Sequence, residues 1–145
     1  GLAGLRLGLI IGRSEWLNEL DKIRLPYNIN MLTQASALFA LENYDMLLAQ
    51  TEQLRIDRLL LSQNLSTMPG LQVYPSEANF VLVRTPKGMA RNWFEELKQK
   101  GILIKCLDGG HDLLADCLRI TVGTTDQNNK LVSAINEISI SGSVQ

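Results

Sequence analysis

Histidine and cysteine are scarce in this chain of 145 residues, which contains one His and two Cys. The cysteines, Cys106 and Cys117, do not form a Cys-x-x-Cys pair, and no second histidine accompanies His111. A metal site and a disulfide framework are therefore both disfavoured. Because His111 follows two glycines and precedes an aspartate, we expect it to be an exposed loop residue.

An excess of charge of one sign is also missing. Fourteen Lys and Arg residues face 15 Asp and Glu residues, for a formal net charge of -1, so no general attraction to nucleic acid or to an anionic membrane is implied. The apolar runs are far shorter than the roughly 20 residues that a membrane helix needs. The first twelve residues lack the basic leader and cleavage site of a secretory signal. We therefore expect a cytoplasmic protein.

What the chain does have is a glycine-punctuated apolar opening, Gly-Leu-Ala-Gly-Leu-Arg-Leu-Gly over residues 1–8. The nearly continuous apolar run from Leu5 to Ile11 predicts a strand that is covered on both faces. Within such a run, the guanidinium of Arg6 needs an anionic partner. A surface arginine on an edge strand is the alternative.

The sequence from Met31 to about Met68 has helical periodicity, with a break expected near residues 42–44 and a stop at Pro69-Gly70. A shorter helix is expected from Ser14, as its cap, through Ile23. Beyond Gly70 the pattern predicts a helix over 88–100 and strands at 71–74, 79–84, 102–105 and 117–122. A last helix is expected to start at a capping box, Thr124 to Gln127, and to end in a frayed tail from Ser139.

This order of elements predicts an α/β fold in two parts. We assign residues 1–50 to the end of a large domain with its connecting helix, and residues 51–145 to a small α+β domain.

The segment Cys117-Leu-Arg-Ile-Thr-Val-Gly-Thr124 holds the second candidate for anion binding, Arg119. In a strand, Arg119 points to the opposite face from Leu118 and Ile120. Its planar fork can form two parallel, charge-assisted hydrogen bonds with a carboxylate or a phosphate. A structural salt bridge is the alternative.

The opening segment and the Arg119 segment together resemble the fold-type I aminotransferases that use pyridoxal phosphate (PLP), and most closely the histidinol-phosphate aminotransferases. The resemblance covers essentially the whole chain. It implies that Arg6 holds the cofactor phosphate and that Arg119 binds the anionic group of the substrate. In this family a lysine carries the cofactor eight residues before that first arginine. Its expected position is three residues before Gly1, so no catalytic residue is assigned within the chain.

Lys105 follows Ile102-Leu-Ile104, where the family commonly has an arginine that helps to hold the substrate phosphate. Lys105 either supplies a point charge to that phosphate or is a solvated lysine at a strand end. Two further segments resemble the family: Asn79-Phe80, which we interpret mostly as architecture, and the loop Pro26-Tyr27-Asn28.

The resemblance implies a homodimeric enzyme of histidine biosynthesis that transfers an amino group between histidinol phosphate and 2-oxoglutarate, giving glutamate. Two alternatives stay open. One is another PLP-dependent enzyme of the same fold type, such as a different aminotransferase or a threonine-phosphate decarboxylase. The other is a non-catalytic dimerisation module.

Overall fold

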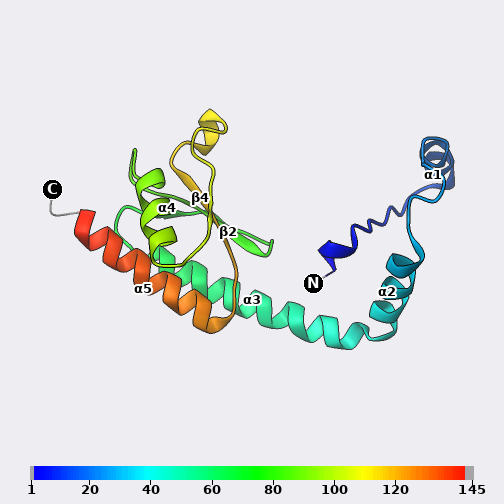
Figure 1. The fold of residues 1–145 in the computed structure, drawn as a ribbon, viewed down its shortest axis with the longest axis horizontal. Helices are drawn as coiled ribbons and strands as arrows, with labels where there is room; N and C mark the ends of the chain where they lie inside the picture. The colour runs from blue at the N-terminus through cyan, green and yellow to red at the C-terminus, as the bar shows by residue number, and fades with distance from the viewer. Residues whose placement is uncertain (1, 143–145) are drawn as a thin grey trace. The chain divides into compact units, whose positions relative to one another are not determined.

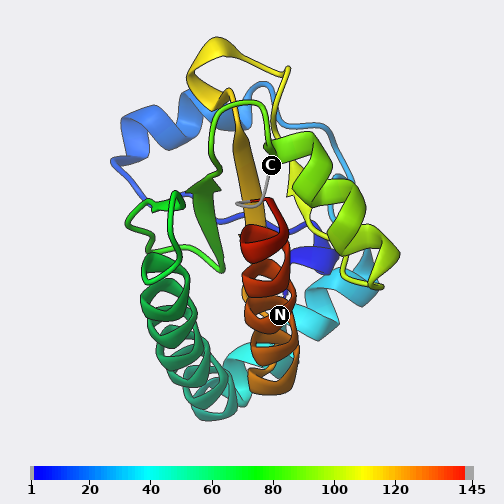
Figure 2. The same ribbon diagram turned by 90° about the vertical axis from the view of Figure 1, so that its left-hand side faces the viewer.

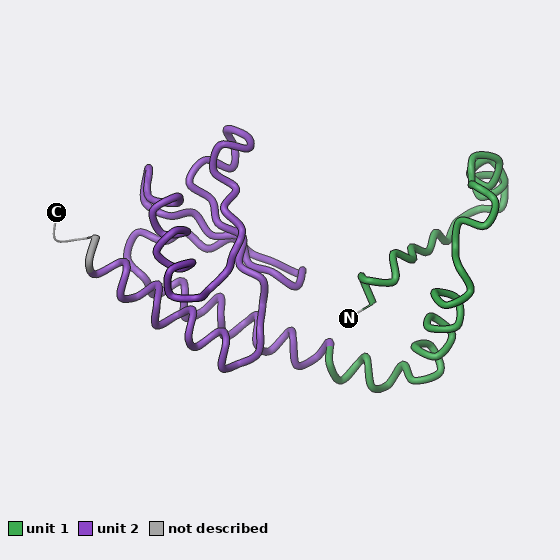
Figure 3. Tube along the Cα trace, in the orientation of Figure 1, with its two compact units in different colours: residues 1–50 green, residues 51–145 purple. Residues whose placement is uncertain are grey.

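The computed structural model describes residues 2–142, which combine helices with one four-stranded antiparallel sheet. The chain divides into two compact units, residues 1–50 (unit 1) and residues 51–145 (unit 2), shown in different colours in Figure 3. The α3 helix, Tyr44–Ser66, runs from one unit into the other.

Unit 1 contains a short 3-10 helix (η1, Ala3–Leu5), α1 (Ser14–Asp21), α2 (Met31–Glu42) and the first turns of α3. The α2 helix begins at Asn30, whose side-chain oxygen accepts a hydrogen bond of 2.9 Å from the Thr33 amide. It ends at Asn43, whose side chain donates to the Phe39 carbonyl at 2.8 Å. The predicted break near residues 42–44 is therefore confirmed.

The strand predicted from Leu5 to Ile11 is wrong. Arg6 closes η1 in the left-handed region at φ 53°, and the residues from 6 to 13 have no regular secondary structure. Ile11 is 96% exposed. A strand owes its stability to a ladder with its neighbours, and none of the residues described in unit 1 forms one. The α1 helix also differs, because Ser14 is its first helical residue rather than its cap, and it ends at Asp21.

Unit 1 exposes much of its apolar surface. In the part of the unit that the structure describes, Ala40 is the only buried hydrophobic residue, whereas Trp16 is 69% exposed and Phe39 63% exposed. None of the helices in residues 2–142 combines the length and hydropathy needed to cross a bilayer.

Unit 2 is built on the sheet, whose strands are β1 (Gln72–Val73), β2 (Phe80–Arg84), β3 (Lys105–Cys106) and β4 (Cys117–Thr121). Their spatial order is β1-β2-β4-β3, and each neighbouring pair is antiparallel. The predicted strands at 71–74, 79–84 and 117–122 are present with shorter bounds. The strand predicted at 102–105 is reduced to β3, because the chain at 102–104 does not pair with β4 and the Ile102 amide donates to the Leu97 carbonyl instead.

Three helices cover one face of this sheet: α3, α4 (Ala90–Gln99) and α5 (Thr125–Gly142) (Figures 1 and 2). They form one hydrophobic core with the strand residues that point the same way. Its strand members are Val81, Val83, Leu118 and Ile120, and its helix members include Leu61 and Leu65 of α3, Trp93 and Leu97 of α4, and Leu131, Ala134, Ile135 and Ile138 of α5. These four α5 residues form the inward face of that helix.

The start of α5 confirms the predicted capping box. Thr124 Oγ1 accepts a hydrogen bond from the Gln127 amide at 3.3 Å, and Gln127 Oε1 accepts one from the Thr124 amide at 3.0 Å. The tail expected to fray from Ser139 is helical as far as Gly142. Its last three residues, 143–145, lie outside the described part of the chain.

Candidate functional site

The candidate site lies on the face of the sheet that points away from the helices. We call this surface the cationic face and define it by Phe80, Lys105 and Arg119. Arg119 of β4 lies opposite Lys105 of β3 and opposite Leu82 of β2, and Phe80 lies opposite Thr121. Side chains directly opposite one another in antiparallel strands share a face, so the register brings Lys105 and Arg119 together.

Arg119 is exposed, whereas Leu118 and Ile120 on either side of it are buried in the core. The predicted orientation of Arg119 is therefore confirmed. Its guanidinium carbon lies 5.4 Å from the centre of the Phe80 ring, within the range of a cation–π contact. Among the residues in the described range, no carboxylate forms an ion pair with Arg119. The guanidinium is thus held over the ring while its N–H groups can reach a ligand.

Lys105 adds a second exposed positive charge to the cationic face. Like charges directly opposite each other in a sheet are destabilising, and a bound anion would relieve this repulsion. Nearby Arg84 serves a different purpose. It donates hydrogen bonds to the carbonyls of Leu113 at 2.8 Å and Ala115 at 3.1 Å. Arg84 therefore holds a loop, whereas Lys105 and Arg119 have no side-chain hydrogen bond or ion pair among the described residues.

The contribution of Phe80 was not foreseen from the sequence, because the contact depends on the pairing of β2 with β4. The segment before it is fixed by several hydrogen bonds. Ser76 Oγ donates to the Phe80 carbonyl at 2.6 Å, and the Asn79 carbonyl accepts from the Val122 amide at 2.9 Å. Arg58 of α3 donates to the Ala78 carbonyl at 3.0 Å. The sequence gives one weak signal for Arg58, which is a cation on the leucine-rich face of a predicted helix.

Arg6 lies in unit 1 and is exposed. No side-chain hydrogen bond or ion pair of Arg6 is found within residues 2–142. The neighbouring glycines have open surroundings, since a Cβ added at Gly4 or Gly8 would meet no atom within 4 Å. A free guanidinium beside accessible backbone has the chemistry to bind a phosphate. The residues present therefore fit the phosphate end of PLP, and no other described residue is assigned to that cofactor.

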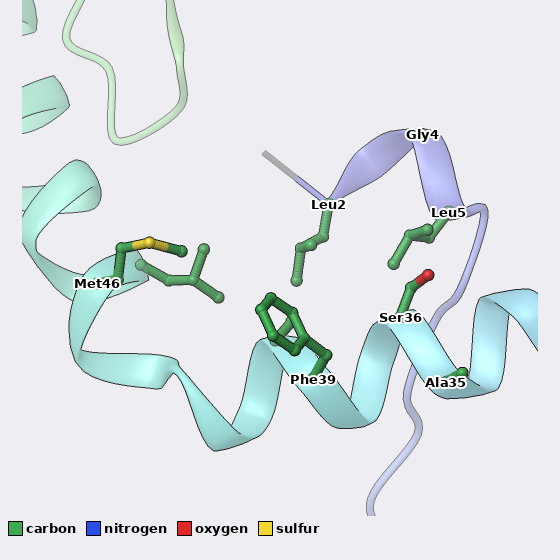
Figure 4. A pocket seen from close by; sticks show the side chains of 9 residues that line it. Leu2, Gly4, Leu5, Ala35, Ser36, Phe39 and Met46 are labelled. Atoms are coloured by element: carbon green, nitrogen blue, oxygen red, sulfur yellow. The ribbon is translucent and has the colours of Figure 1, made fainter.

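Unit 1 also contains a shallow apolar cavity of about 550 Å³ between η1 and the helices α2 and α3 (Figure 4). Leu2 and Leu5 point toward Phe39 in this view. The other lining residues are Gly4, Ala35, Ser36, Ala40, Met46 and Leu47. None of these side chains ionises, so this cavity offers no acid, base or charged ligand for chemistry.

Two other residues singled out in the sequence lie outside the helices and strands. Tyr27 has a left-handed backbone at φ 58° and is 99% exposed. His111 is exposed, which confirms the expectation for it. It also has a local role that the sequence did not reveal, because its Nδ1 accepts a 3.1 Å hydrogen bond from the Leu113 amide and caps a short 3-10 helix, Asp112–Leu114.

The chain belongs to the aminotransferase class I and II family, whose model matches residues 1–135.

Within that family, the chain is 52% identical over 135 residues to histidinol-phosphate aminotransferase 2 of Nitrosococcus oceani. That alignment includes 93% of this chain and 38% of the relative, so the chain spans well under half the length of the curated protein it matches.

Solved structures agree with this placement. A Burkholderia pseudomallei protein assigned as an aminotransferase superposes with a TM-score of 0.84 at 31% identity, covering 96% of this chain and 42% of its own. Histidinol-phosphate aminotransferase from Sinorhizobium meliloti, solved in complex with pyridoxal-5'-phosphate, superposes with a TM-score of 0.72 at 28% identity. It covers 86% of this chain and 34% of its own.

Proposed function

We propose that this chain is the C-terminal part of a PLP-dependent histidinol-phosphate aminotransferase, which transfers an amino group between histidinol phosphate and 2-oxoglutarate in histidine biosynthesis. The observation that carries the proposal is the unpaired Arg119 guanidinium beside Lys105 on the cationic face. The identity of 52% to a histidinol-phosphate aminotransferase supports the choice of substrate.

In this proposal Arg119 binds the anionic group of either substrate, which is a phosphate or an α-carboxylate. Two parallel N–H bonds would fix the plane of that group and hence the direction of the reacting Cα–H bond. The Phe80 ring limits the rotation of the guanidinium before the substrate arrives. Lys105 contributes a point charge without a fork, so it would strengthen binding of a phosphate without setting its orientation.

Arg6 would hold the phosphate of PLP, with unit 1 as the end of the large domain and unit 2 as the small domain. When bound, PLP supplies the electron sink that aminotransferase chemistry requires. None of the lysines in the chain lies in a sequence context like that of the cofactor-carrying lysine of this family. We therefore expect the 145-residue chain alone to have no transaminase activity.

The partner of the whole protein is proposed to be a second copy of itself. The apolar surface of unit 1, with Trp16 and Phe39 among its exposed residues, supports association rather than a free solvated face.

The test of the proposed function is a comparison of amino donors with the full-length protein, meaning this chain together with the part of its relatives that it does not span. Histidinol phosphate should react with a higher kcat/KM than aspartate or an aromatic amino acid. A higher value for one of the other donors would indicate a different aminotransferase, and release of carbon dioxide would indicate a decarboxylase. A purified protein that shows no Schiff-base absorption once free PLP has been removed would be a non-catalytic module.

A further inference from the structure

The guanidinium of Arg119 rests on the Phe80 ring, and the position of that ring depends on the loop that precedes β2. Phe80 is the first residue of β2, so its position follows from the path of residues 76–79 as they enter the sheet. Ser76 Oγ accepts a hydrogen bond from the Ala78 amide at 3.1 Å and donates one to the Phe80 carbonyl at 2.6 Å. Both bonds lie within the loop and its first strand residue. These bonds shape the loop but do not attach it to the core.

The Asn79 carbonyl ties the loop to the chain that follows β4, by accepting from the Val122 amide at 2.9 Å. Arg58 ties the loop to α3. Its Nη1 donates to the Ala78 carbonyl at 3.0 Å, and its Nη2 lies 2.7 Å from Glu77 Oε2. The Arg58 side chain is 12% exposed, whereas that of Glu77 is 93% exposed. An ion pair with so exposed a partner contributes little. The bond to the Ala78 carbonyl, two residues before Phe80, is therefore the stronger constraint.

Asp57, the residue before Arg58 on α3, attaches the chain that leaves β4 at the same end of the sheet. Asp57 is buried and accepts a 2.9 Å hydrogen bond from Thr125 Oγ1, at the start of α5 just after β4. Phe80 lies opposite Thr121 where β2 begins and β4 ends. One turn of α3 thus holds the chain entering β2 and the chain leaving β4, on either side of the Phe80–Arg119 contact.

We propose that Arg58 is a positioning residue for Arg119: by fixing the 76–79 loop, it holds the Phe80 ring on which the substrate-binding guanidinium rests. The inference rests on the proposed function, because it assumes that Arg119 binds the substrate anion. The Arg58 side chain is 12% exposed, and both of its Nη atoms donate to the 76–79 loop, so we assign it to the loop and not to the substrate.

The experiment measures KM and kcat of the full-length protein with histidinol phosphate and 2-oxoglutarate. Arg58→Ala should raise the KM of both substrates roughly two- to fivefold, the value of a lost cation–π contact at an exposed site. Because Arg58 touches no reacting group, kcat should stay close to that of the wild type. Arg58→Lys, which can still donate to the Ala78 carbonyl, should recover most of the affinity.

Two matched controls are available. Arg55 lies on the same helix, its side chain is 63% exposed, and its guanidinium forms an ion pair with Glu52 at 3.6 Å. Arg55→Ala should therefore leave both KM values unchanged. Glu77→Gln removes the exposed ion pair while keeping the Arg58–Ala78 bond, and it should likewise have no effect. A thermal unfolding curve for each variant separates a loss of folded protein from a loss of affinity.

The double variant Arg58→Ala, Arg119→Ala decides how Arg58 acts. If Arg58 works through Arg119, its replacement should raise KM no further once Arg119 is absent. An equal rise in both backgrounds, or a lower unfolding temperature with unchanged KM, would overturn the proposal and make Arg58 a purely structural residue. If Arg58→Ala does not fold, Phe80→Leu is judged by the same criteria. A normal KM for Arg119→Ala alone would instead place the anion site elsewhere and overturn this inference, whereas the comparison of amino donors tests the proposed function.

Discussion

Replacing Arg119 by alanine should lower catalytic efficiency strongly while changing the stability of the fold only slightly. Arg119 is exposed, and its neighbours in the core, Leu118 and Ile120, are unaffected by its removal. The specific interaction that the described part of the folded chain would lose is the cation–π contact with the Phe80 ring at 5.4 Å. An exposed contact of this kind contributes about 0.5–1 kcal/mol to stability.

The expected loss in catalysis is larger. A bidentate guanidinium makes two charge-assisted hydrogen bonds with its anion, and removing one partner of such a bond costs about 1.5–3 kcal/mol. Because the site is exposed in this chain, we expect a total of about 2–3 kcal/mol, which corresponds to a fall in kcat/KM of roughly 30- to 150-fold. Arg119→Lys should recover only part of this loss, since an ammonium lacks the fork.

Steady-state kinetics of the full-length protein, together with its unfolding temperature, provide the assay. The reasoning requires a large kinetic change with an almost unchanged unfolding temperature. Wild-type kinetics for Arg119→Ala would place the anion site elsewhere. A strongly destabilised variant would show that Arg119 serves the fold, contrary to its exposure.

Further outcomes are expected at other positions. Lys105→Glu should raise the KM of the phosphorylated substrate far more than that of glutamate, whereas Lys105→Arg should preserve or strengthen its binding; equal effects of Lys105→Glu on both would exclude a phosphate-specific role. Leu65→Ala, at a fully buried site, should lower the free energy of unfolding by about 2–5 kcal/mol in urea titrations, while Leu59→Ala on the same helix should change it by less than about 0.5 kcal/mol. In light scattering, the 145-residue chain should have a mass above 16.1 kDa because unit 1 exposes apolar side chains, and a clean monomer would contradict this.

Local patterns were sufficient to predict several elements correctly. The capping box at Thr124 and Gln127, the break before α3 and the orientation of Arg119 each depend on residues within a few positions of one another. Periodicity and capping chemistry act over that same range, so a single sequence contains the necessary information.

The errors in the strands and in the site occur where the outcome depends on partners distant in sequence. The apolar run from Leu5 to Ile11 has the composition of a buried strand, but a strand forms only beside another strand. The chain at 102–104 is similar, because pairing with β4 begins only at Lys105. The predicted site lacked Arg58 for the same reason. Arg58 and the carbonyl to which it donates are 20 residues apart, and no local pattern indicates that bond.

The two tryptophans provide the chain with a pair of optical probes. Trp93 is 2% exposed in the core of unit 2, and Trp16 is 69% exposed in unit 1. Indole emission shifts to shorter wavelength when the ring leaves water, so the two residues emit in different parts of the spectrum. With Trp16→Phe, the remaining signal reports the folding of unit 2. With Trp93→Phe, a blue shift would show the moment at which another protein surface covers unit 1.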